Sequence, residues 1–514
     1  MRLCNGTATL GMLVVLFVAA GTARAQPGGD CGALANLKIE DTNLLSAAIA
    51  PAGGGLPEYC RVLGYVRPAI NFEVRMPTRE WNGKFYMAGC GGFCGTLDSD
   101  SDGFANAMNY GLKRNYAAAT MDSGHWGVSV LDGRWAYNNR VAENDWGWRA
   151  VTETARVAKA LVKTYYGAEQ KKAYFAGCST GGRMANMEAR KFPNDFDGII
   201  SGAPTLDYTG LPATFFAWLV QANTGPDGRD ILQKQKVALV RDKVYEACDA
   251  KDGLKDGLID DPRACDFKPA SLRCRAGDGA DCLTAAEVGV LEKWYAGARD
   301  SKGRQLYPGG IPLGSEPFWP LWLTGLEEGG GRLAQRINAE FLRYMAFADD
   351  PGESYSAAKF DFDSDPPRLA TMAAIYNSTD PDLSAFKARG GKLLMYHGWA
   401  DPIVTPQLTV DYYEAVEKKI GGREATQGFL RLFMIPGFDH CGWQPGPGIT
   451  ELGFDPLTAL ENWVEKGEAP ASLLATKQGN DGKTVWTRPL CPYPQKAKYK
   501  GGDANVATNF TCSD

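Results

Sequence analysis

Histidine is scarce in this sequence, and dense positive charge is absent from it. The 514 residues contain only His125, His397 and His440, so few imidazole side chains are available for chemistry. The formal net charge is -5, and no block of lysine and arginine is present. Nucleic acids and anionic membrane surfaces are bound by clustered positive charge. We therefore expect neither as a partner.

Long hydrophobic runs are absent beyond the N-terminus. Leu10 to Ala20 forms one short apolar run, with Arg2 before it and the small-x-small sequence Ala23-Arg24-Ala25 after it. This order is typical of a secretory signal peptide, and the run is too short for a permanent membrane helix. We expect residues 1–25 to be a signal peptide and the mature protein to be secreted or periplasmic, with no membrane partner.

Zinc-binding cysteine patterns are also missing, because no CxxC pair has a partner pair. Of the 13 cysteines, Cys4 leaves with the signal peptide, and the remaining number is even. An even number of cysteines in an oxidising compartment indicates disulfides. We expect six of them.

Strands alternate with helices in two parts of the chain. In residues 26–204, short apolar runs predict strands and one-sided apolar spacing predicts helices; the strands are 84–88, 115–121, 172–176 and 198–200, and the helices 145–166 and 183–191. The pattern returns in residues 391–514, with strands 391–396 and 430–435 and a helix from about Gln407. Such alternation is typical of an α/β fold with a doubly wound, mostly parallel sheet.

The segment 205–390 lacks this alternation. It contains loops rich in glycine and aspartate, four clustered cysteines, and an aromatic stretch around Trp319 and Trp322. We expect this segment to be a lid domain inserted into the α/β core.

One pentapeptide has the form of a nucleophile motif. Gly177-Cys178-Ser179-Thr180-Gly181 matches G-x-S-x-G, with a predicted strand before it and a predicted helix after it. In α/β-hydrolases this turn exposes a serine at the C-terminal end of a strand, and small neighbours give the backbone room for it. The alternative is a tight turn without chemistry. We expect an α/β-hydrolase core with Ser179 as the nucleophile.

The base and the acid follow from chain order, which in this fold is serine, acid and then histidine. His440 lies in a loop just after a predicted strand, and Asp401 follows the strand before that one. Asp439 beside the histidine is a rival for the acid. His397 is expected to be a neighbour of the acid loop, and His125 to lie in the substrate pocket or at the surface.

A tetrahedral intermediate also needs preorganised N–H donors. One donor should be the backbone N–H of Thr180, the residue after the nucleophile. The second should come from the glycine-rich loop 89–95, where Gly91 and Gly92 are the candidates. The alternative is a glycine turn with no part in catalysis.

Two cysteines adjoin the proposed catalytic residues. Cys178 precedes Ser179, and Cys441 follows His440. If serine and histidine meet, these cysteines come within disulfide reach of each other. The rival interpretation makes Cys178 a thiol nucleophile, which an oxidising compartment and an even cysteine count disfavour.

An acidic loop in the predicted lid has the composition of a cation site. Asp249, Asp252 and Asp256 recur at a spacing of three to four residues, with glycines between them. Together with the carbonyl groups of Leu254 and Leu258, they offer oxygen ligands to a hard cation such as Ca²⁺. The spacing is not that of an EF-hand. The alternative is a solvated acidic turn.

Three motifs together resemble one family. They are Gly-Cys-Ser-Thr-Gly-Gly-Arg at 177–183, His-Gly-Trp-Ala-Asp-Pro at 397–402 and Asp-His-Cys-Gly-Trp at 439–443. The chain resembles the tannase and feruloyl esterase family from about Cys31 to Cys512. The resemblance implies an α/β-hydrolase with a lid, and it implies hydrolysis of esters of aromatic acids, feruloyl and galloyl esters among them.

The same resemblance implies particular residues. It implies a triad of Ser179, Asp401 and His440, a bridge from Cys178 to Cys441, and a structural Ca²⁺ held by Asp249, Asp252, Leu254, Asp256 and Leu258. The other bridges drawn are Cys31–Cys60, Cys90–Cys94, Cys248–Cys265, Cys274–Cys282 and Cys491–Cys512.

The family also includes hydrolases of terephthalate monoesters such as mono(2-hydroxyethyl) terephthalate. In these enzymes a lid arginine holds the free carboxylate, and Phe and Ser follow it four and five positions later. Arg343 and Phe347 match, but Ala348 stands in place of the serine, and Val404 stands where those enzymes have an aromatic residue. Feruloyl-type esters are therefore the first expectation, and terephthalate monoesters the alternative.

Two further functions compete with ester hydrolysis. One is a calcium-stabilised secreted binding protein that has lost catalysis, which the intact order of serine, aspartate and histidine disfavours. The other is a secreted serine peptidase on the same fold, for which the sequence offers no recognisable means of binding a peptide backbone.

Overall fold

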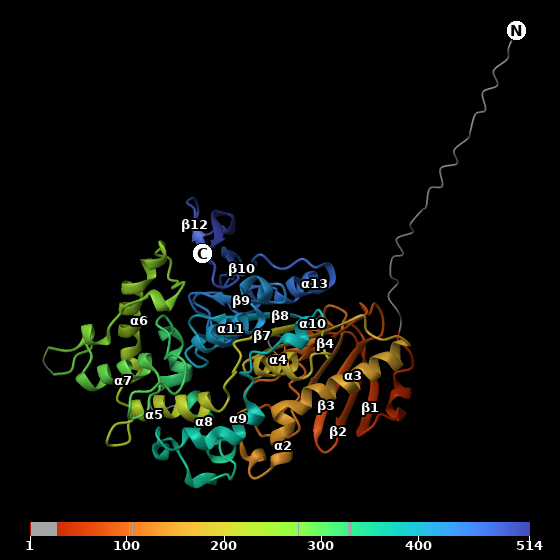
Figure 1. Cartoon of the computed structure of the whole chain (residues 1–514), viewed down its shortest axis with the longest axis horizontal. Coiled ribbons are helices and arrows are strands. Elements are labelled where there is room, and N and C mark those ends of the chain that lie inside the picture. The colour runs from red at the N-terminus through yellow and green to blue at the C-terminus, as the bar shows by residue number, and fades with distance from the viewer. Residues whose placement is uncertain (2–27, 102, 105, 276, 327–331) are drawn as a thin grey trace.

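A single nine-stranded sheet forms the centre of the protein (Figure 1). The computed structural model describes residue 1 and residues 28–514, except 102, 105, 276 and 327–331. The strands, in their order across the sheet, are β1 (Thr42–Ala50), β2 (Tyr59–Val66), β3 (Ile70–Pro77), β5 (Ala117–Met121), β4 (Lys84–Ala88), β6 (Lys172–Cys178), β7 (Gly198–Gly202), β8 (Lys392–Gly398) and β9 (Leu430–Ile435).

Six of these strands run parallel. From β5 through β4 and β6 to β9, each strand pairs parallel with its neighbour, whereas β1, β2 and β3 pair antiparallel and β3 pairs antiparallel with β5. The predicted, mostly parallel α/β sheet is therefore confirmed. Its carboxyl-terminal edge is the edge where such folds bind ligands.

Strand residues alternate strictly between two apolar layers. In β6, Ala173 and Phe175 face one layer, and Tyr174 and Ala176 face the other. The helices that supply the first layer are α3 (Ala150–Tyr166), α4 (Thr180–Lys191) and α11 (Pro406–Ile420), and those of the second are α1 (Met108–Leu112) and α13 (Pro456–Lys466). Helices on both faces explain why these strands have almost no polar positions.

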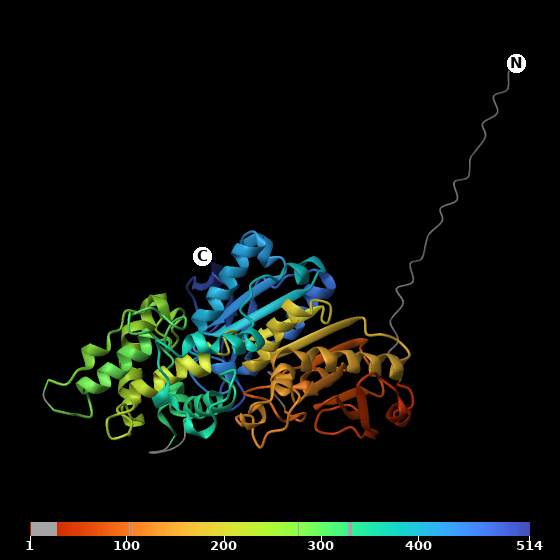
Figure 2. The ribbon, with the colours of Figure 1, turned by 60° about the horizontal axis from the view of Figure 1, so that its bottom comes forward.

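The described part of segment 205–390 is helical and contributes no strand to the sheet. Its helices are α5 (Phe216–Asn223), α6 (Lys234–Cys248), α7 (Ala285–Ala296), α8 (Leu333–Tyr344), α9 (Ala370–Tyr376) and α10 (Ser384–Ala388). Figures 1 and 2 show α5 to α8 gathered at one end of the molecule, while β1 to β3 lie at the other. This segment, predicted to be a lid, leaves the core after β7 and returns at β8.

Some elements differ from the prediction. The antiparallel strands β1 to β3 were not expected, nor were the pairs β10 (Leu473–Gln478) with β11 (Thr484–Leu490) and β12 (Lys496–Tyr499) with β13 (Phe510–Ser513). The helix expected over 145–166 begins as a π-helical turn, Asp145–Arg149. The small helices α2 (Arg140–Asn144) and α12 (Arg423–Gln427) complete the set.

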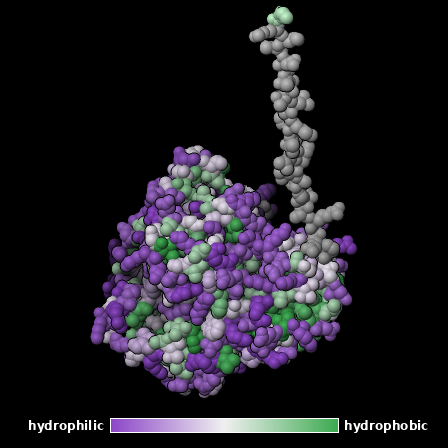
Figure 3. Space-filling model, turned by 45° about the vertical axis from the view of Figure 1, so that its right-hand side comes forward, coloured by the Kyte–Doolittle hydropathy of each residue, from purple (hydrophilic) through white to green (hydrophobic). Residues whose placement is uncertain are grey.

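Most of the surface seen in Figure 3 is hydrophilic, with hydrophobic groups in small scattered patches. Within the described residues, no helix has the length and apolar character that crossing a bilayer requires. The predicted signal peptide, 1–25, lies outside the described residues apart from Met1.

Six disulfides join the twelve described cysteines. Their pairings are those drawn from the sequence: Cys31–Cys60, Cys90–Cys94, Cys178–Cys441, Cys248–Cys265, Cys274–Cys282 and Cys491–Cys512. Of these six bridges, only Cys178–Cys441 joins the two halves of the α/β core, and its two cysteines are 263 positions apart along the chain.

Candidate active site

Ser179 occupies a sharp turn between β6 and α4. Its backbone has φ 63° and ψ -121°, a conformation that non-glycine residues seldom adopt and that costs about 1–3 kcal/mol. The turn brings Gly177 and Gly181 so close that a Cβ on Gly177 would lie 2.5 Å from the Gly181 carbonyl group. The N–H of Ser179 donates to the Gly202 carbonyl at 3.0 Å, which ties the turn to β7. This is the strained elbow that the G-x-S-x-G motif predicts.

His440 and Asp401 are hydrogen-bonded to each other. His440 Nδ1 lies 2.7 Å from Asp401 Oδ2, and both side chains are buried. The other carboxylate oxygen of Asp401 accepts the backbone N–H groups of Ile403 and Val404, each at 2.9 Å. Asp401 therefore holds the imidazole in one orientation, with Nε2 left for a substrate or nucleophile.

The two aspartates near His440 have opposite pKa shifts. Burial opposes ionisation of Asp401, but its interactions with His440 and His397 outweigh burial and lower its pKa below the usual range. Burial, followed by the negative charge of Asp401, raises the pKa of Asp439 to about 7. Asp439 accepts hydrogen bonds from Gln444. The structure therefore makes Asp401 the partner of the histidine.

His397 lies behind this pair. Its Nε2 is 2.8 Å from the Val404 carbonyl oxygen and 3.2 Å from Asp401 Oδ2, and its Nδ1 is 2.7 Å from Thr409 Oγ1. Because a carbonyl oxygen only accepts, the proton belongs on Nε2, and the Thr409 hydroxyl donates to Nδ1. His397 thus neighbours the acid, as the sequence suggested.

Ser179 and His440 open onto one cavity and are linked through their neighbours. Both residues line a cavity of about 400 Å³. The Cys178–Cys441 bridge joins the residue before the serine to the residue after the histidine, with the two Cα atoms 6.0 Å apart. No hydrogen bond joins the Ser179 hydroxyl to His440 among the described residues, a contact that often tightens only when a substrate binds.

The glycine loop lies against the same cavity. Gly91 and Gly92 line it, and their N–H groups donate to no carbonyl oxygen of the described chain. Gly92 has φ 57°, and a Cβ there would lie 2.3 Å from the Val130 carbonyl oxygen, so only glycine fits. The N–H of Thr180 opens α4 and points out of the helix's first turn, as N-terminal N–H groups do.

Two side chains hold this loop in place. The Gly92 carbonyl oxygen accepts the hydroxyl groups of Thr180 at 2.5 Å and Tyr208 at 3.0 Å. Asn106 ties the elbow itself, because its side chain donates to the Cys178 carbonyl and accepts the Cys178 N–H. No sequence motif indicates Tyr208 or Asn106, since both act through contacts with residues far along the chain.

The cavity walls are largely apolar. Trp322 from the inserted segment and Trp443 both meet the His440 ring edge-on, with ring centroids 5.6 and 5.3 Å away. Other apolar lining comes from Val130, Leu131, Leu211, Phe216, Leu333, Ile337, Ile403 and Val404. An aromatic group of a substrate has favourable partners here.

Two predicted substrate residues lie elsewhere. Val404 lines the cavity, but Arg343 and Phe347 do not. Arg343 is near the end of α8 and turns away, donating to the Tyr355 carbonyl. Phe347 is buried against Tyr355 and the guanidinium of Arg368. The substrate-binding roles expected for these two residues from family spacing stay predictions, and the residues of α8 that line the cavity are Leu333 and Ile337.

His125 is a packed core residue. Its ring stacks on Trp135 at 3.7 Å and is 6% exposed, and burial lowers its pKa to about 3. The sequence left two roles open for His125, at the surface or in the substrate pocket. The residue is neither exposed nor part of the cavity lining.

The acidic loop keeps its carboxylates close together. Asp249 accepts the N–H groups of Asp256 and Gly257, and Asp256 pairs with Arg488 at 2.7 Å. Burial, and beyond it the charge of Asp256, raises the pKa of both Asp249 and Asp252. No three acidic, histidine or cysteine side chains of the described chain converge as metal ligands in this conformation. Carboxylate and carbonyl oxygens are nevertheless the ligands that a hard cation such as Ca²⁺ prefers, and the Asp256 carboxylate is held by Arg488 in this conformation.

Comparison with known proteins identifies the family. The model for "Tannase and feruloyl esterase" matches residues 56–513. The chain belongs to the tannase and feruloyl esterase family. Its membership, and the sheet described above, confirm the α/β-hydrolase fold and make the protein a carboxylic ester hydrolase.

Named relatives in this family act on different esters. A mono(2-hydroxyethyl) terephthalate hydrolase of Piscinibacter sakaiensis is 34% identical over 91% of this chain and 87% of its own length. A probable feruloyl esterase of Arthroderma benhamiae is 33% identical, and the match covers 84% of this chain and 80% of that protein's length. The crystal structure of feruloyl esterase B from Aspergillus oryzae superposes with a TM-score of 0.81 at 26% identity, covering 93% of this chain and 98% of that chain.

Proposed function

We propose that this esterase is a serine hydrolase of esters of aromatic acids, with Ser179, His440 and Asp401 as its triad. The observation that carries the proposal is the buried Asp401–His440 pair, joined by the Cys178–Cys441 bridge to the strained turn of Ser179. Nucleophile, base and orienting carboxylate stand in the order this chemistry needs.

The proposed reaction has two halves. His440 Nε2 takes the proton of Ser179 as its Oγ attacks the ester carbonyl carbon, and the N–H groups of Thr180 and of Gly91 or Gly92 stabilise the oxyanion. The intermediate collapses, breaks the bond to the alcohol oxygen, and returns the proton from His440 to the leaving alcohol. Water then repeats both steps on the acyl-enzyme, which releases the acid and restores Ser179.

The substrate class follows from the walls of the cavity. Trp322, Trp443 and Phe216 provide aromatic surface for the ring of a feruloyl or galloyl group. Relatives that carry the name feruloyl esterase support the same class.

Ser179→Ala tests the mechanism with methyl ferulate and methyl gallate as substrates. We expect a folded variant whose turnover falls by about 10⁴-fold or more, because the nucleophile is gone. Ser101→Ala, which changes another serine at the cavity, is the matched control and should keep most of the activity. Turnover near the wild-type level in Ser179→Ala would rule out this triad.

Secretion and calcium binding belong to the same proposal. Six disulfides favour an oxidising compartment, outside the cell or in a periplasm. A Ca²⁺ ion in the loop 249–258 would be held by Asp249, Asp252, Asp256 and the carbonyls of Leu254 and Leu258. It would stabilise the inserted segment and take no part in the reaction.

A further inference from the structure

The active-site cavity has no positively charged wall. Among the described residues, no Lys or Arg lines the cavity. Besides Ser179 and His440, its polar lining consists of Asp98, Ser101, Asn106, Thr205, Tyr208 and the loop glycines. The internal residues outside the described set, 102, 105, 276 and 327–331, include no Lys or Arg in the sequence. None of those internal positions can therefore supply a lysine or arginine side chain to the cavity.

The arginines of helix α8 lie outside the cavity lining. The helix contributes Leu333 and Ile337 to the cavity; Arg332 is its N-cap, Arg336 is exposed and Arg343 lies in its last turn. Arg332 pairs with Asp230 at 2.6 Å. Arg343 donates to the Tyr355 carbonyl and lies 3.8 Å from Glu340.

Two negative charges lie at or behind the cavity, and the buried guanidinium of Arg183 lies behind the Tyr208 ring, where it donates to backbone carbonyl groups. Asp401 stays ionised behind His440, because the two histidines lower its pKa. Asp98 is an exposed carboxylate at the lining. An anionic substrate would meet the two negative charges after losing much of its hydration, and burying an unpaired carboxylate in a largely apolar site is strongly unfavourable.

We infer that the cavity selects esters that carry no charged group, and that it discriminates against esters carrying a free carboxylate. This inference rests on the proposed function and sharpens it. A penalty of a few kcal/mol corresponds to about 100-fold or more in kcat/KM, since each 1.4 kcal/mol is tenfold.

Two substrates of nearly equal shape isolate the charge. Methyl 4-carbamoylbenzoate and methyl 4-carboxybenzoate carry the same methyl ester on the same ring. They differ only in the group opposite the ester, which is a neutral amide in the first and a carboxylate in the second. We expect kcat/KM for the amide to exceed that for the carboxylate by about 100-fold. The ratio should shrink as the pH is lowered toward the substrate acid's own pKa, where the second ester becomes neutral.

A substitution on the cavity wall tests the cause. Ile337→Arg places a cation on the half-buried face of α8 that lines the cavity, and it should lower the amide-to-carboxylate ratio at least tenfold. Gln335→Arg adds the same charge on the exposed side of α8, outside the cavity lining, and should leave the ratio unchanged.

The outcomes separate the inference from the proposed function. Equal kcat/KM for the two esters in the wild type would overturn the charge selection and leave ester hydrolysis intact. A ratio that Gln335→Arg lowers as much as Ile337→Arg would also overturn it. Failure to hydrolyse any aromatic ester, methyl ferulate included, would overturn both the inference and the proposed function.

Discussion

At the scale of single residues, the choice between two carboxylates is decided by their partners. Asp401 and Asp439 are both buried near His440. Asp401 accepts from His440 Nδ1 and has a lowered pKa, whereas Asp439 accepts from Gln444 and has a raised one. Only an ionised carboxylate on Nδ1 can support the imidazolium that forms during attack.

Asp401→Asn should therefore lower kcat by about 10³–10⁴-fold, because the amide favours the wrong tautomer of His440. Asp439→Asn is the matched control: it is nearly isosteric, lies beside the same histidine, and should cost less than about tenfold in kcat. The measurement is the kcat of each variant on methyl ferulate. If the Asp439 variant were the more damaged of the two, Asp439 would be the acid.

Much of the candidate site was predictable from the sequence at this scale. The residues that could not be predicted share one property: they contact the site from positions far along the chain. Ser179, Asp401 and His440 follow from a local motif and from chain order. Tyr208 reaches Gly92 across 116 residues, and Asn106 reaches Cys178 across 72. No local pattern encodes such contacts. Arg343 matched a family spacing, yet its position at the end of α8 turns it toward Tyr355.

At the scale of elements, the elbow and the histidine loop depend on one covalent link. Ser179 directly follows β6, and His440 lies in the loop after β9. In the sheet, β7 and β8 separate these two strands. The Cys178–Cys441 bridge closes a loop of 263 residues. Fixing so long a loop restricts the unfolded chain strongly, and chain-entropy arguments give about 5 kcal/mol for it.

The double variant Cys178→Ala/Cys441→Ala should lose both stability and activity. We expect its melting temperature to fall by several degrees or more, and its kcat to fall at temperatures where it is still folded, because serine and base lose their fixed spacing. The double variant Cys274→Ala/Cys282→Ala, which opens a bridge over 8 residues in the inserted segment, should leave kcat unchanged. Equal kcat in the first variant and the wild type would show that the bridge is purely structural.

The acidic loop leads to a second prediction at this scale. If Ca²⁺ binds residues 249–258, chelation with EGTA should lower the melting temperature, since a ligand bound only by the folded state stabilises it by mass action. Added Ca²⁺ should restore it, and Asp249→Asn should abolish the response. Asp242→Asn, an exposed change on α6, is the control. An unchanged melting temperature, with no calcium in elemental analysis of untreated protein, would argue against the site.

At the scale of the whole molecule, the sequence predicted the centre of the sheet better than its edges. The parallel strands are buried on both faces and appear as short apolar runs, so their pattern is plain. β1 is an edge strand with no fully buried residue, and its side chains give little alternation. The hairpin β10–β11 likewise mixes exposed and buried positions on a small sheet.

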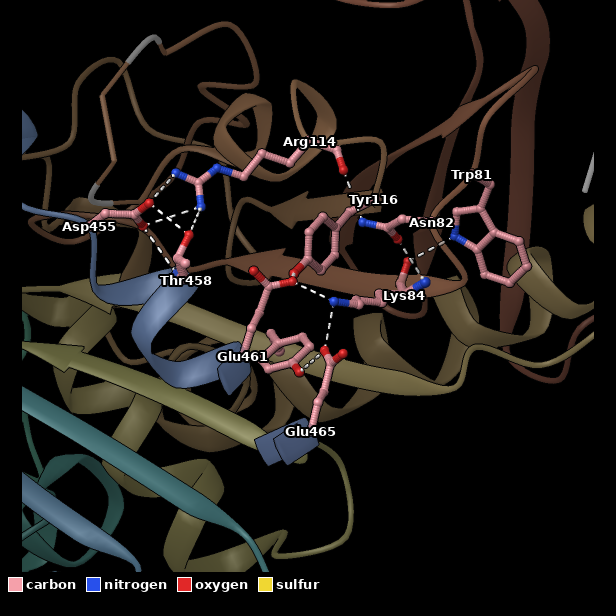
Figure 4. A network of polar contacts seen from close by, with 10 residues as sticks. Trp81, Asn82, Lys84, Arg114, Tyr116, Asp455, Thr458, Glu461 and Glu465 are labelled. Carbon is pink, nitrogen blue, oxygen red and sulfur yellow. Dashed lines mark hydrogen bonds and ion pairs between the residues drawn. The ribbon is translucent and has the colours of Figure 1, made fainter. Parts of the chain in front are cut away.

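An ionic cluster holds the last helix against the sheet, at the edge opposite to Ser179. Lys84 at the start of β4 lies 2.6 Å from both Glu461 and Glu465 of α13 (Figure 4). Tyr116 and Tyr174 donate to the same two glutamates. The side chain of Lys84 is 20% exposed, so the cluster is mostly shielded from water. Burial opposes the charge on Lys84, but the two glutamates outweigh it and raise its pKa.

Lys84→Met should lower the free energy of unfolding by about 1–3 kcal/mol, because two largely buried carboxylates lose their cation. Since the folded pKa of Lys84 is raised, its contribution is fully present below the unfolded value near 10.4 and is lost as the pH rises through the folded value. The difference from wild type should accordingly narrow above about pH 10.5. Urea unfolding of both proteins at neutral and alkaline pH measures this difference in the free energy of unfolding.

Two controls determine whether the cluster is the cause. Lys163→Met, a change on α3, breaks an exposed pair with Glu169 and should leave the free energy of unfolding nearly unchanged. Adding Glu461→Gln and Glu465→Gln to Lys84→Met should restore part of the lost free energy of unfolding, because the two carboxylates that Lys84 had paired are then uncharged amides. All of these variants should keep the wild-type kcat while folded, since Lys84 begins β4 and the proposed nucleophile, Ser179, follows the carboxyl end of β6. A Lys84→Met protein as stable as wild type at neutral pH would mean that apolar packing alone holds α13 in place.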